Sequence, residues 1–155
     1  MYDQKLRDKR ILAKLNLDKL PPKFHDDNFK TLGAEVSSFI HFVFDLRKRT
    51  ESLNWCFGNI KRVKIFLLIF HANELGNEIY KEQITKKIPE YSYKTIAKII
   101  DDGIEKKHFI LLTPDGISGK DGKIKNIRPS EDLITDFLNL SIEVWSRLEK
   151  NFNRF

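Results

Sequence analysis

Side chains that donate hydrogen bonds gather at the beginning of a segment at residues 92–106 that is predicted to be a helix. These polar or cationic residues are Ser92, Tyr93, Lys94, Thr95 and Lys98, while Asp101, Asp102 and Glu105 lie toward the other end. Hydroxyl and ammonium groups are hydrogen-bond donors for phosphate oxygens and base edges. Acidic side chains would be repelled by phosphates, so we expect only the first two turns to enter a DNA groove.

Lys94 and Lys98 are four residues apart and therefore share one face of such a helix. A DNA-binding helix contacts base edges mainly through its N-terminal residues, which is where these lysines stand. The same pair would also suit an ordinary solvated helix face, and the two lysines alone do not decide between these readings. The segments on either side of the helix are what favours DNA.

A second basic group follows at residues 120–128. The turn sequences TPDG and SGKDG separate two strand-like runs, HFILLT at 108–113 and KIKNIR at 123–128, which predicts a β-hairpin. Its tip and return strand carry Lys120, Lys123, Lys125 and Arg128. We expect these cations to contact flanking phosphates, a role that positions a protein on DNA but carries little sequence information.

Residue patterns for metal binding and catalysis are missing from the sequence. The single cysteine, Cys56, cannot form an internal disulfide, and the four histidines have no cysteine or carboxylate at ligand spacing. There is no phosphate-binding glycine-rich loop and no HExxH motif. We therefore expect no metal, no cofactor and no catalytic residues, although a Ser–His–Asp triad is a spatial arrangement that one sequence leaves open.

The sequence predicts a cytoplasmic protein without a membrane segment. A single cysteine suits a reducing compartment. The first residues, MYDQKLRDKRILAKL, alternate charges with single apolar residues, unlike a secretion signal. The longest apolar run, IFLLIF at 65–70, has six residues, whereas a helix needs roughly 20 to span a bilayer.

The net charge of +6 is concentrated in the middle of the chain. Lysine and arginine exceed aspartate and glutamate by 11 to 8 in residues 1–56 and by 14 to 9 in residues 57–128, whereas residues 129–155 hold 3 against 5. A basic excess is compatible with a polyanionic partner. Basic proteins also bind membranes or simply stay soluble, so the charge by itself does not identify the partner.

Two long helical patterns precede the basic segments. The first begins near Thr31 and ends at the basic residues 47–50, as the helix dipole favours. The second covers residues 58–76, with Gly76 as its C-cap. Its end is apolar nearly all round, which is typical of a helix buried in the centre of a domain.

Two shorter helices come next, on either side of a turn. The segment 78–88 has apolar residues four apart and stops at Pro89, which cannot continue a helix. Ser92 is a good N-cap for the following helix, whose inner face holds Ile96, Ile99 and Ile100. Gly103 falls on this face, where a glycine costs about 1 kcal/mol relative to alanine, so we expect a neighbouring element to approach it closely.

The order helix, helix, turn, helix, hairpin predicts a mainly α protein with a small β wing, that is, a winged helix-turn-helix. TIAKIIDDGIEKKHFI at 95–110 resembles the recognition helix and first wing strand of the MarR (multiple antibiotic resistance regulator) family of transcription factors. KDGKIKNIRPSEDLI at 120–134 is similar to the family's wing return and final helix. The family usually has a glycine where this chain has Lys107, and an arginine where it has Lys123.

The resemblance covers about residues 31–152 and implies long dimerisation helices on both sides of the DNA-binding domain. We expect an N-terminal arm at 1–30, a dimerisation helix at 31–56, a winged helix-turn-helix domain at 57–128 and a C-terminal dimerisation helix at 129–155. The long helices offer more apolar surface than a small domain can cover. This predicts a homodimer through Val36, Phe39, Ile40, Val43, Phe137, Trp145 and Leu148.

The leading hypothesis is a sequence-specific, double-stranded DNA-binding transcriptional regulator that acts as a homodimer. Helix 92–106 would lie in the major groove and the basic wing 113–128 on flanking DNA, and two-fold symmetry would place half-sites about one helical turn apart. The resemblance also implies a small-molecule effector between the dimerisation helices and the DNA-binding domain. Neither the effector, the operator, the sign of regulation nor the role of residues 1–30 follows from the sequence.

Two alternative hypotheses assign the protein to other functional classes. The winged helix could be a protein-interaction module of a larger assembly, with its basic face on an acidic partner and without specific DNA binding. An enzyme that uses the domain only as a scaffold is the weaker of the two, and its sign would be a polar pocket with convergent titratable groups.

Overall fold

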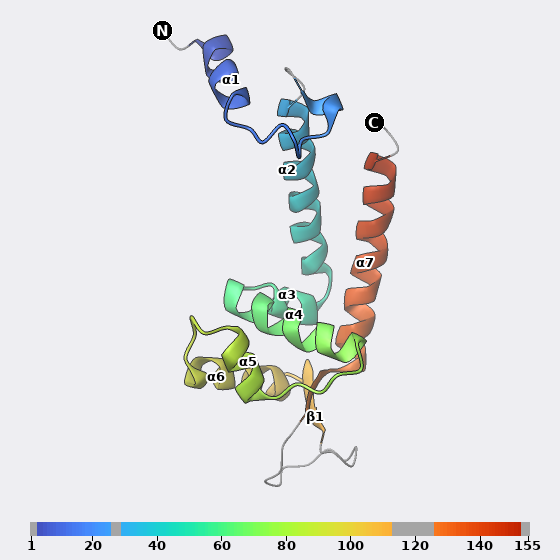
Figure 1. Ribbon diagram of the computed structural model, residues 1–155. Helices are drawn as coiled ribbons and strands as arrows, with labels where there is room; N and C mark the ends of the chain where they lie inside the picture. Colours follow the sequence, from blue (N-terminus) through green and yellow to red (C-terminus); the bar gives the residue numbers. More distant parts are fainter. Residues whose placement is uncertain (1–2, 26–28, 113–125, 153–155) are drawn as a thin grey trace. The chain divides into compact units, whose positions relative to one another are not determined.

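Helices dominate the computed structural model, which describes residues 3–25, 29–112 and 126–152 (Figure 1). Within those residues the strands form one antiparallel pair, β1 (Phe109–Leu112) and β2 (Asn126–Pro129). The prediction of a mainly α protein with a small β element is therefore confirmed. Among the described helices, none combines the length and the apolar character needed to cross a membrane.

The chain divides into two compact units. The first unit comprises residues 1–46 together with 146–155, and the second unit comprises residues 47–145. The second unit is larger at both ends than the domain predicted at 57–128. It is larger because α3 (Glu51–Cys56) and most of α7 (Glu131–Phe152) pack with it.

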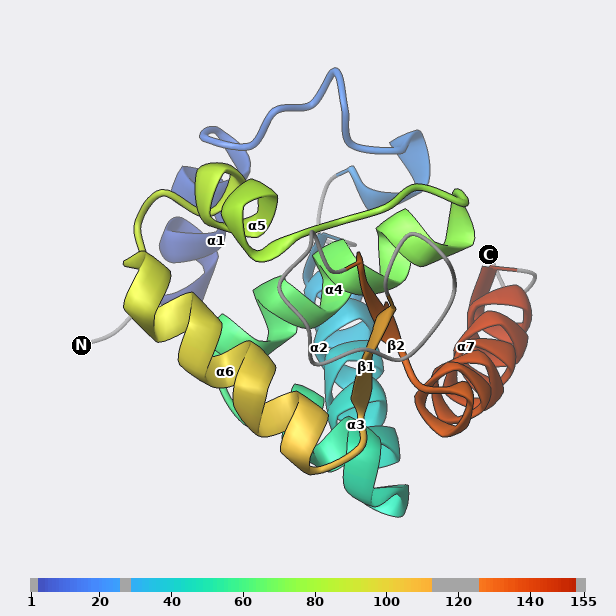
Figure 2. The same cartoon turned by 90° about the horizontal axis from the view of Figure 1, so that it is seen from below.

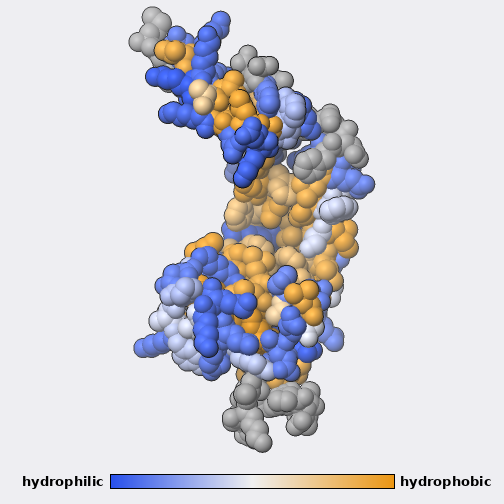
Figure 3. Space-filling model, in the orientation of Figure 1, coloured by the Kyte–Doolittle hydropathy of each residue, from blue (hydrophilic) through white to orange (hydrophobic). Residues whose placement is uncertain are grey.

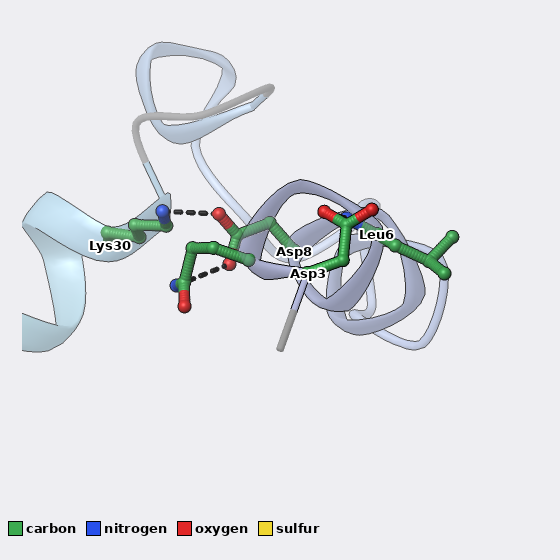
Figure 4. Close-up of polar contacts among 5 residues, drawn as sticks. Asp3, Leu6, Asp8 and Lys30 are labelled. Carbon is green, nitrogen blue, oxygen red and sulfur yellow. Dashed lines mark hydrogen bonds and ion pairs between the residues drawn. The ribbon is translucent and has the colours of Figure 1, made fainter. Parts of the chain in front are cut away.

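The first unit begins with α1 (Gln4–Leu12), a short helix within the segment that was predicted to be an N-terminal arm. Asp3 caps this helix, because its Oδ1 atom accepts a hydrogen bond from the backbone N–H of Leu6 over 3.2 Å. Asp8 forms an ion pair with Lys30 (Figure 4). This pair ties α1 to the long helix that follows.

That long helix, α2 (Phe29–Leu46), matches the first helix predicted from the sequence. It ends where the 3₁₀ turn η3 (Arg47–Arg49) begins, at the basic residues that were expected to close it. Before α2, Pro21 and Pro22 lead into the short turn η1 (Pro22–Phe24), whose Phe24 is buried. The dimerisation helix predicted at 31–56 is therefore not continuous, because η3 separates α2 from α3.

The core of the second unit is built around α4 (Ile60–Glu74). Its side chains Ile65, Phe66 and Ile69 are fully buried, which confirms that this helix is central. Gly76 adopts φ +70° and ends the helix, as predicted.

The short helix α3 was not separated from α2 by its sequence pattern, yet it completes this core. Thr50 caps it, with its hydroxyl accepting from the backbone N–H of Leu53 over 3.4 Å. Leu53, Trp55 and Cys56 are all buried. A six-residue helix holds too few turns to display a helical period, so its burial comes from tertiary packing rather than from a pattern in its sequence.

The segment before α5 (Lys81–Lys87) is extended, so the helix predicted at 78–88 was wrong for its first residues. The backbone N–H of Ile79 donates to the Asn126 side chain over 2.9 Å, and its carbonyl accepts from the backbone N–H of Ile127, also over 2.9 Å. These bonds join the segment to β2. They satisfy backbone groups that would otherwise be buried without partners, since Ile79 is 4% exposed.

The helix α6 (Tyr93–Glu105) leads through a tight turn into β1, which lies beside β2 (Figure 2). Phe109 is opposite Pro129 in the register of the two strands. The predicted turns between the strands fall at 113–125, outside the described residues. After β2, Ser130 caps α7, because its hydroxyl accepts from the backbone N–H of Leu133 over 3.1 Å.

Gly103 lies on the buried face of α6, and the expected close approach is confirmed. A Cβ atom at this position would be 2.3 and 2.6 Å from two ring carbons of Phe109 and 3.1 Å from Cη2 of Trp55. The Trp55 and Phe109 rings pack edge to face with their centroids 5.8 Å apart. The glycine is therefore a packing residue that allows β1 and α3 to meet α6.

Replacing Lys107 with glycine is expected to stabilise the protein by about 1 kcal/mol. Lys107 ends α6 with φ +64°, a conformation that costs free energy for a residue with a Cβ. The backbone N–H groups of Lys107 and His108 donate to the carbonyls of Ile104 and Gly103, the pattern of a Schellman cap. Denaturant unfolding measures the gain. Lys106→Gly is the control, since Lys106 has φ −79° and should gain nothing.

The thiol of Cys56 is expected to be unreactive in the folded protein. Cys56 is fully buried, and this burial raises its pKa from 9.0 to about 12. The thiolate that attacks a disulfide reagent is then nearly absent at pH 8. A chromogenic disulfide reagent should titrate one thiol only after denaturant is added. Rapid reaction of the native protein would contradict the burial of this side chain.

Candidate nucleic-acid interface

Ser92 and Thr95 form the start of α6. The Ser92 hydroxyl accepts from the backbone N–H of Thr95 over 3.2 Å and lies 3.0 Å from the Thr95 hydroxyl. Ser92 is exposed, whereas Thr95 is half-buried. Ser92 therefore caps the helix and also faces solvent, whereas the Thr95 hydroxyl is paired with the capping hydroxyl.

Tyr93, Lys94 and Lys98 extend outward from the same end of the helix. Tyr93 is 48% exposed, and both lysines are exposed. In the described part of the chain, neither Lys94 nor Lys98 has an ion pair or a side-chain hydrogen bond. Their positive charges are therefore available to an anionic partner, while Ile96 and Ile100 fill the core behind them.

The acidic end of α6 has a partner that the sequence did not indicate. Lys81, at the start of α5, forms an ion pair with Asp101 over 2.7 Å. Asp102 is half-buried and Glu105 is exposed. The exposed face of α6 thus changes from cationic at Lys94 and Lys98 to acidic at Glu105, with the charge of Asp101 partly balanced by α5.

Of the four basic residues predicted on the hairpin, only Arg128 lies among the described residues. Lys120, Lys123 and Lys125 lie outside the described residues. Arg128 is half-buried in β2, opposite Ile110, and its Nε atom is buried without a hydrogen-bond partner in the described part of the protein. Arg128 therefore stands at the base of the hairpin, not at its tip.

The residues predicted to form a dimer interface differ in exposure. Val36 and Ile40 on α2 are about half exposed, and Trp145 on α7 is 70% exposed. Orange surface along α2 is visible in Figure 3. The others, Phe39, Val43, Phe137 and Leu148, are half-buried in their own chain.

Phe137 contributes to the core of the second unit. Its ring centroid lies 4.5 Å from that of Phe70 and 5.2 Å from that of Phe66. On the exposed side of α7, Leu138 and Ile142 continue the face that carries Trp145. The exposed apolar surface of α7 is therefore formed by Trp145 together with Leu138 and Ile142, two residues that were not in the predicted dimer interface.

A serine, an aspartate and a histidine come together near the end of α6, although not in the order of a catalytic triad. The Ser52 hydroxyl donates directly to Asp136 over 2.7 Å, and no hydrogen bond among the described residues joins His108 to either. His108 is buried against Trp55, and burial lowers its pKa. A triad requires the histidine between the other two side chains, so this arrangement does not provide a nucleophile with its base.

A cavity of about 610 Å³ opens on the second unit. Its apolar lining comes from Leu67, Leu68, Phe70, Ile88 and Phe137, and its charged lining from Lys64, His71, Glu74, Lys87 and Glu90. Its volume is in the range of small-molecule sites. No cluster of three or more potential metal ligands is present in the described residues.

Comparisons with protein-family models, with curated proteins and with solved structures gave no match for this chain.

Proposed function

We propose that this protein is a sequence-specific, double-stranded DNA-binding regulator of the winged helix-turn-helix type, with α6 as its recognition helix. The observation that carries the proposal is the charge on α6. Lys94 and Lys98 are exposed, share one face and have no partner in the described residues, at the end of the helix that reads bases in such domains. The acidic residues stand at the far end, away from phosphates.

The surroundings of α6 support this assignment. The helices α4, α5 and α6 are followed by an antiparallel hairpin, and the backbone of Ile79 bonds to the return strand. This is the element order of a winged helix. Lys107 holds the left-handed conformation at the position where the MarR family usually has glycine, which supports the proposed correspondence with that family.

The proposed regulator acts as a homodimer through α2 and α7. Exposed apolar side chains on these helices, including Ile40, Ile142 and Trp145, are the support for an isologous interface. Two copies of α6 would then read half-sites about one helical turn apart. The 610 Å³ cavity offers a place for a small-molecule effector with an apolar body.

Two measurements test the proposal together. Light scattering should give twice the chain mass of 18.3 kDa, and fluorescence anisotropy should detect duplex binding that weakens steeply as salt increases. A monomer that shows no salt-dependent retention of duplex DNA would contradict the proposal. That result would favour a protein-interaction module.

A further inference from the structure

Two lysines of α4 lie over the ring of Tyr91, in the turn directly before α6. The Nζ atom of Lys61 is 5.4 Å from the ring centroid and that of Lys64 is 5.6 Å from it, both within the range of a cation–π interaction. Tyr91 immediately precedes Ser92, the N-cap of α6. The helix α4 thus brings positive charge to the same end of α6 that carries Lys94 and Lys98.

The two ammonium groups over Tyr91 have different partners. Lys64 donates to Glu90 over 2.6 Å, and this hydrogen bond raises the pKa of Lys64 and lowers that of Glu90. The charge of Lys64 is therefore matched by a carboxylate. Lys61 is exposed, and within the described residues it contacts the aromatic ring without forming an ion pair. The cluster of Lys61, Lys64 and Glu90 consequently keeps one net positive charge.

We infer that Lys61, held over the ring of Tyr91, contacts a DNA phosphate beside the start of α6. This inference rests on the proposed DNA binding and adds α4 to an interface that the sequence assigned only to α6 and the hairpin. Lysine carries a compact charge on a flexible stem. The cation–π contact with Tyr91 favours side-chain conformations that place the ammonium group of Lys61 beside the turn. A phosphate contact fixes the position of α6 on the duplex without reading a base.

The test compares Lys61→Gln with Lys106→Gln in the full-length protein. Both variants remove one exposed charge, but Lys106 stands just beyond the opposite end of α6. For Lys61→Gln, the slope of log affinity against log salt should fall in magnitude by about 0.9 per bound subunit. Binding should weaken alike for all duplex sequences. Lys106→Gln should keep the wild-type slope.

A slope unchanged by Lys61→Gln, or reduced equally by both variants, would overturn the inference while leaving the proposed function intact. A wild-type protein without salt-dependent duplex binding would instead contradict the proposed function itself. Two variants of Tyr91 test the role of the ring. Tyr91→Phe should keep the wild-type slope, and Tyr91→Leu should lose part of it. A leucine variant with the full slope would show that the ring does not position Lys61.

Discussion

The Gly103→Val protein is expected to lose about 3 kcal/mol of unfolding free energy, because a side chain at this position has no room. The nearest ring carbon of Phe109 would be 2.3 Å from the new Cβ. Phe109 is itself 1% exposed and packs against Trp55, so its ring cannot move aside without disturbing the core. Denaturant unfolding followed by tryptophan fluorescence measures the loss as a lower midpoint.

Alanine substitutions separate this packing effect from helix propensity. Alanine is favoured over glycine by about 1 kcal/mol inside a helix. At Gly33 in α2 an added Cβ meets nothing within 4 Å, so Gly33→Ala should not destabilise the protein. Gly103→Ala should still destabilise it, by about 1–2 kcal/mol, because the free-energy cost of overpacking exceeds the gain in helix propensity. A Gly103→Ala protein as stable as the wild type would contradict the close packing of α6 against β1.

The protein carrying both Lys94→Ala and Lys98→Ala is expected to bind its DNA site at least about tenfold more weakly. A side chain that reaches a base edge with good geometry is worth roughly 1–3 kcal/mol, and about 1.4 kcal/mol corresponds to tenfold in affinity. Both lysines are exposed and have no described partner whose loss would disturb the fold. Fluorescence anisotropy at several salt concentrations should show weaker binding and a smaller salt slope.

Lys106→Ala is the matched control for this loss, since Lys106 is exposed just past the acidic end of α6. It removes a positive charge from the same region, and its affinity and salt slope should stay close to those of the wild type. Circular dichroism should give equal helix content for all three proteins, because alanine and lysine are both good helix formers. Unchanged affinity in the folded double variant would remove α6 from the interface.

Local patterns in the sequence were sufficient for most of the helices. The N-cap Ser92, the C-terminal Gly76 and the isoleucine face of α6 each follow from rules that involve a few neighbouring residues. The position of Gly103 was also predictable, because it shares the face of Ile96 and Ile100. Its partners, Phe109 and Trp55, were not, since contacts between distant segments leave no local pattern.

The errors of sequence reasoning came from these non-local contacts. Residues 78–80 have helical spacing, but bonds from Ile79 to Asn126 and Ile127 hold them extended. No neighbouring residue signals such a pairing. A tertiary contact thus overrode a weak helical preference.

In the candidate site, too, local features could be predicted from the sequence and contacts between distant segments could not. The charge change along α6 was readable from the sequence, because it depends only on the order of residues in one helix. The ion pair between Lys81 and Asp101 and the position of Lys61 over Tyr91 depend on how α4 and α5 pack against α6. Charges contributed by other elements therefore became visible only in the structure.

Selection of bound sequences from random duplex DNA tests the central claim most directly. The full-length protein is incubated with a random library, and bound duplexes are recovered and sequenced over several rounds. The proposed dimer should enrich a palindromic motif with half-sites about one helical turn apart, and the Lys94→Ala, Lys98→Ala protein should fail to enrich it. No enrichment by the wild-type protein would contradict sequence-specific DNA binding. A single half-site without symmetry would contradict reading by a dimer.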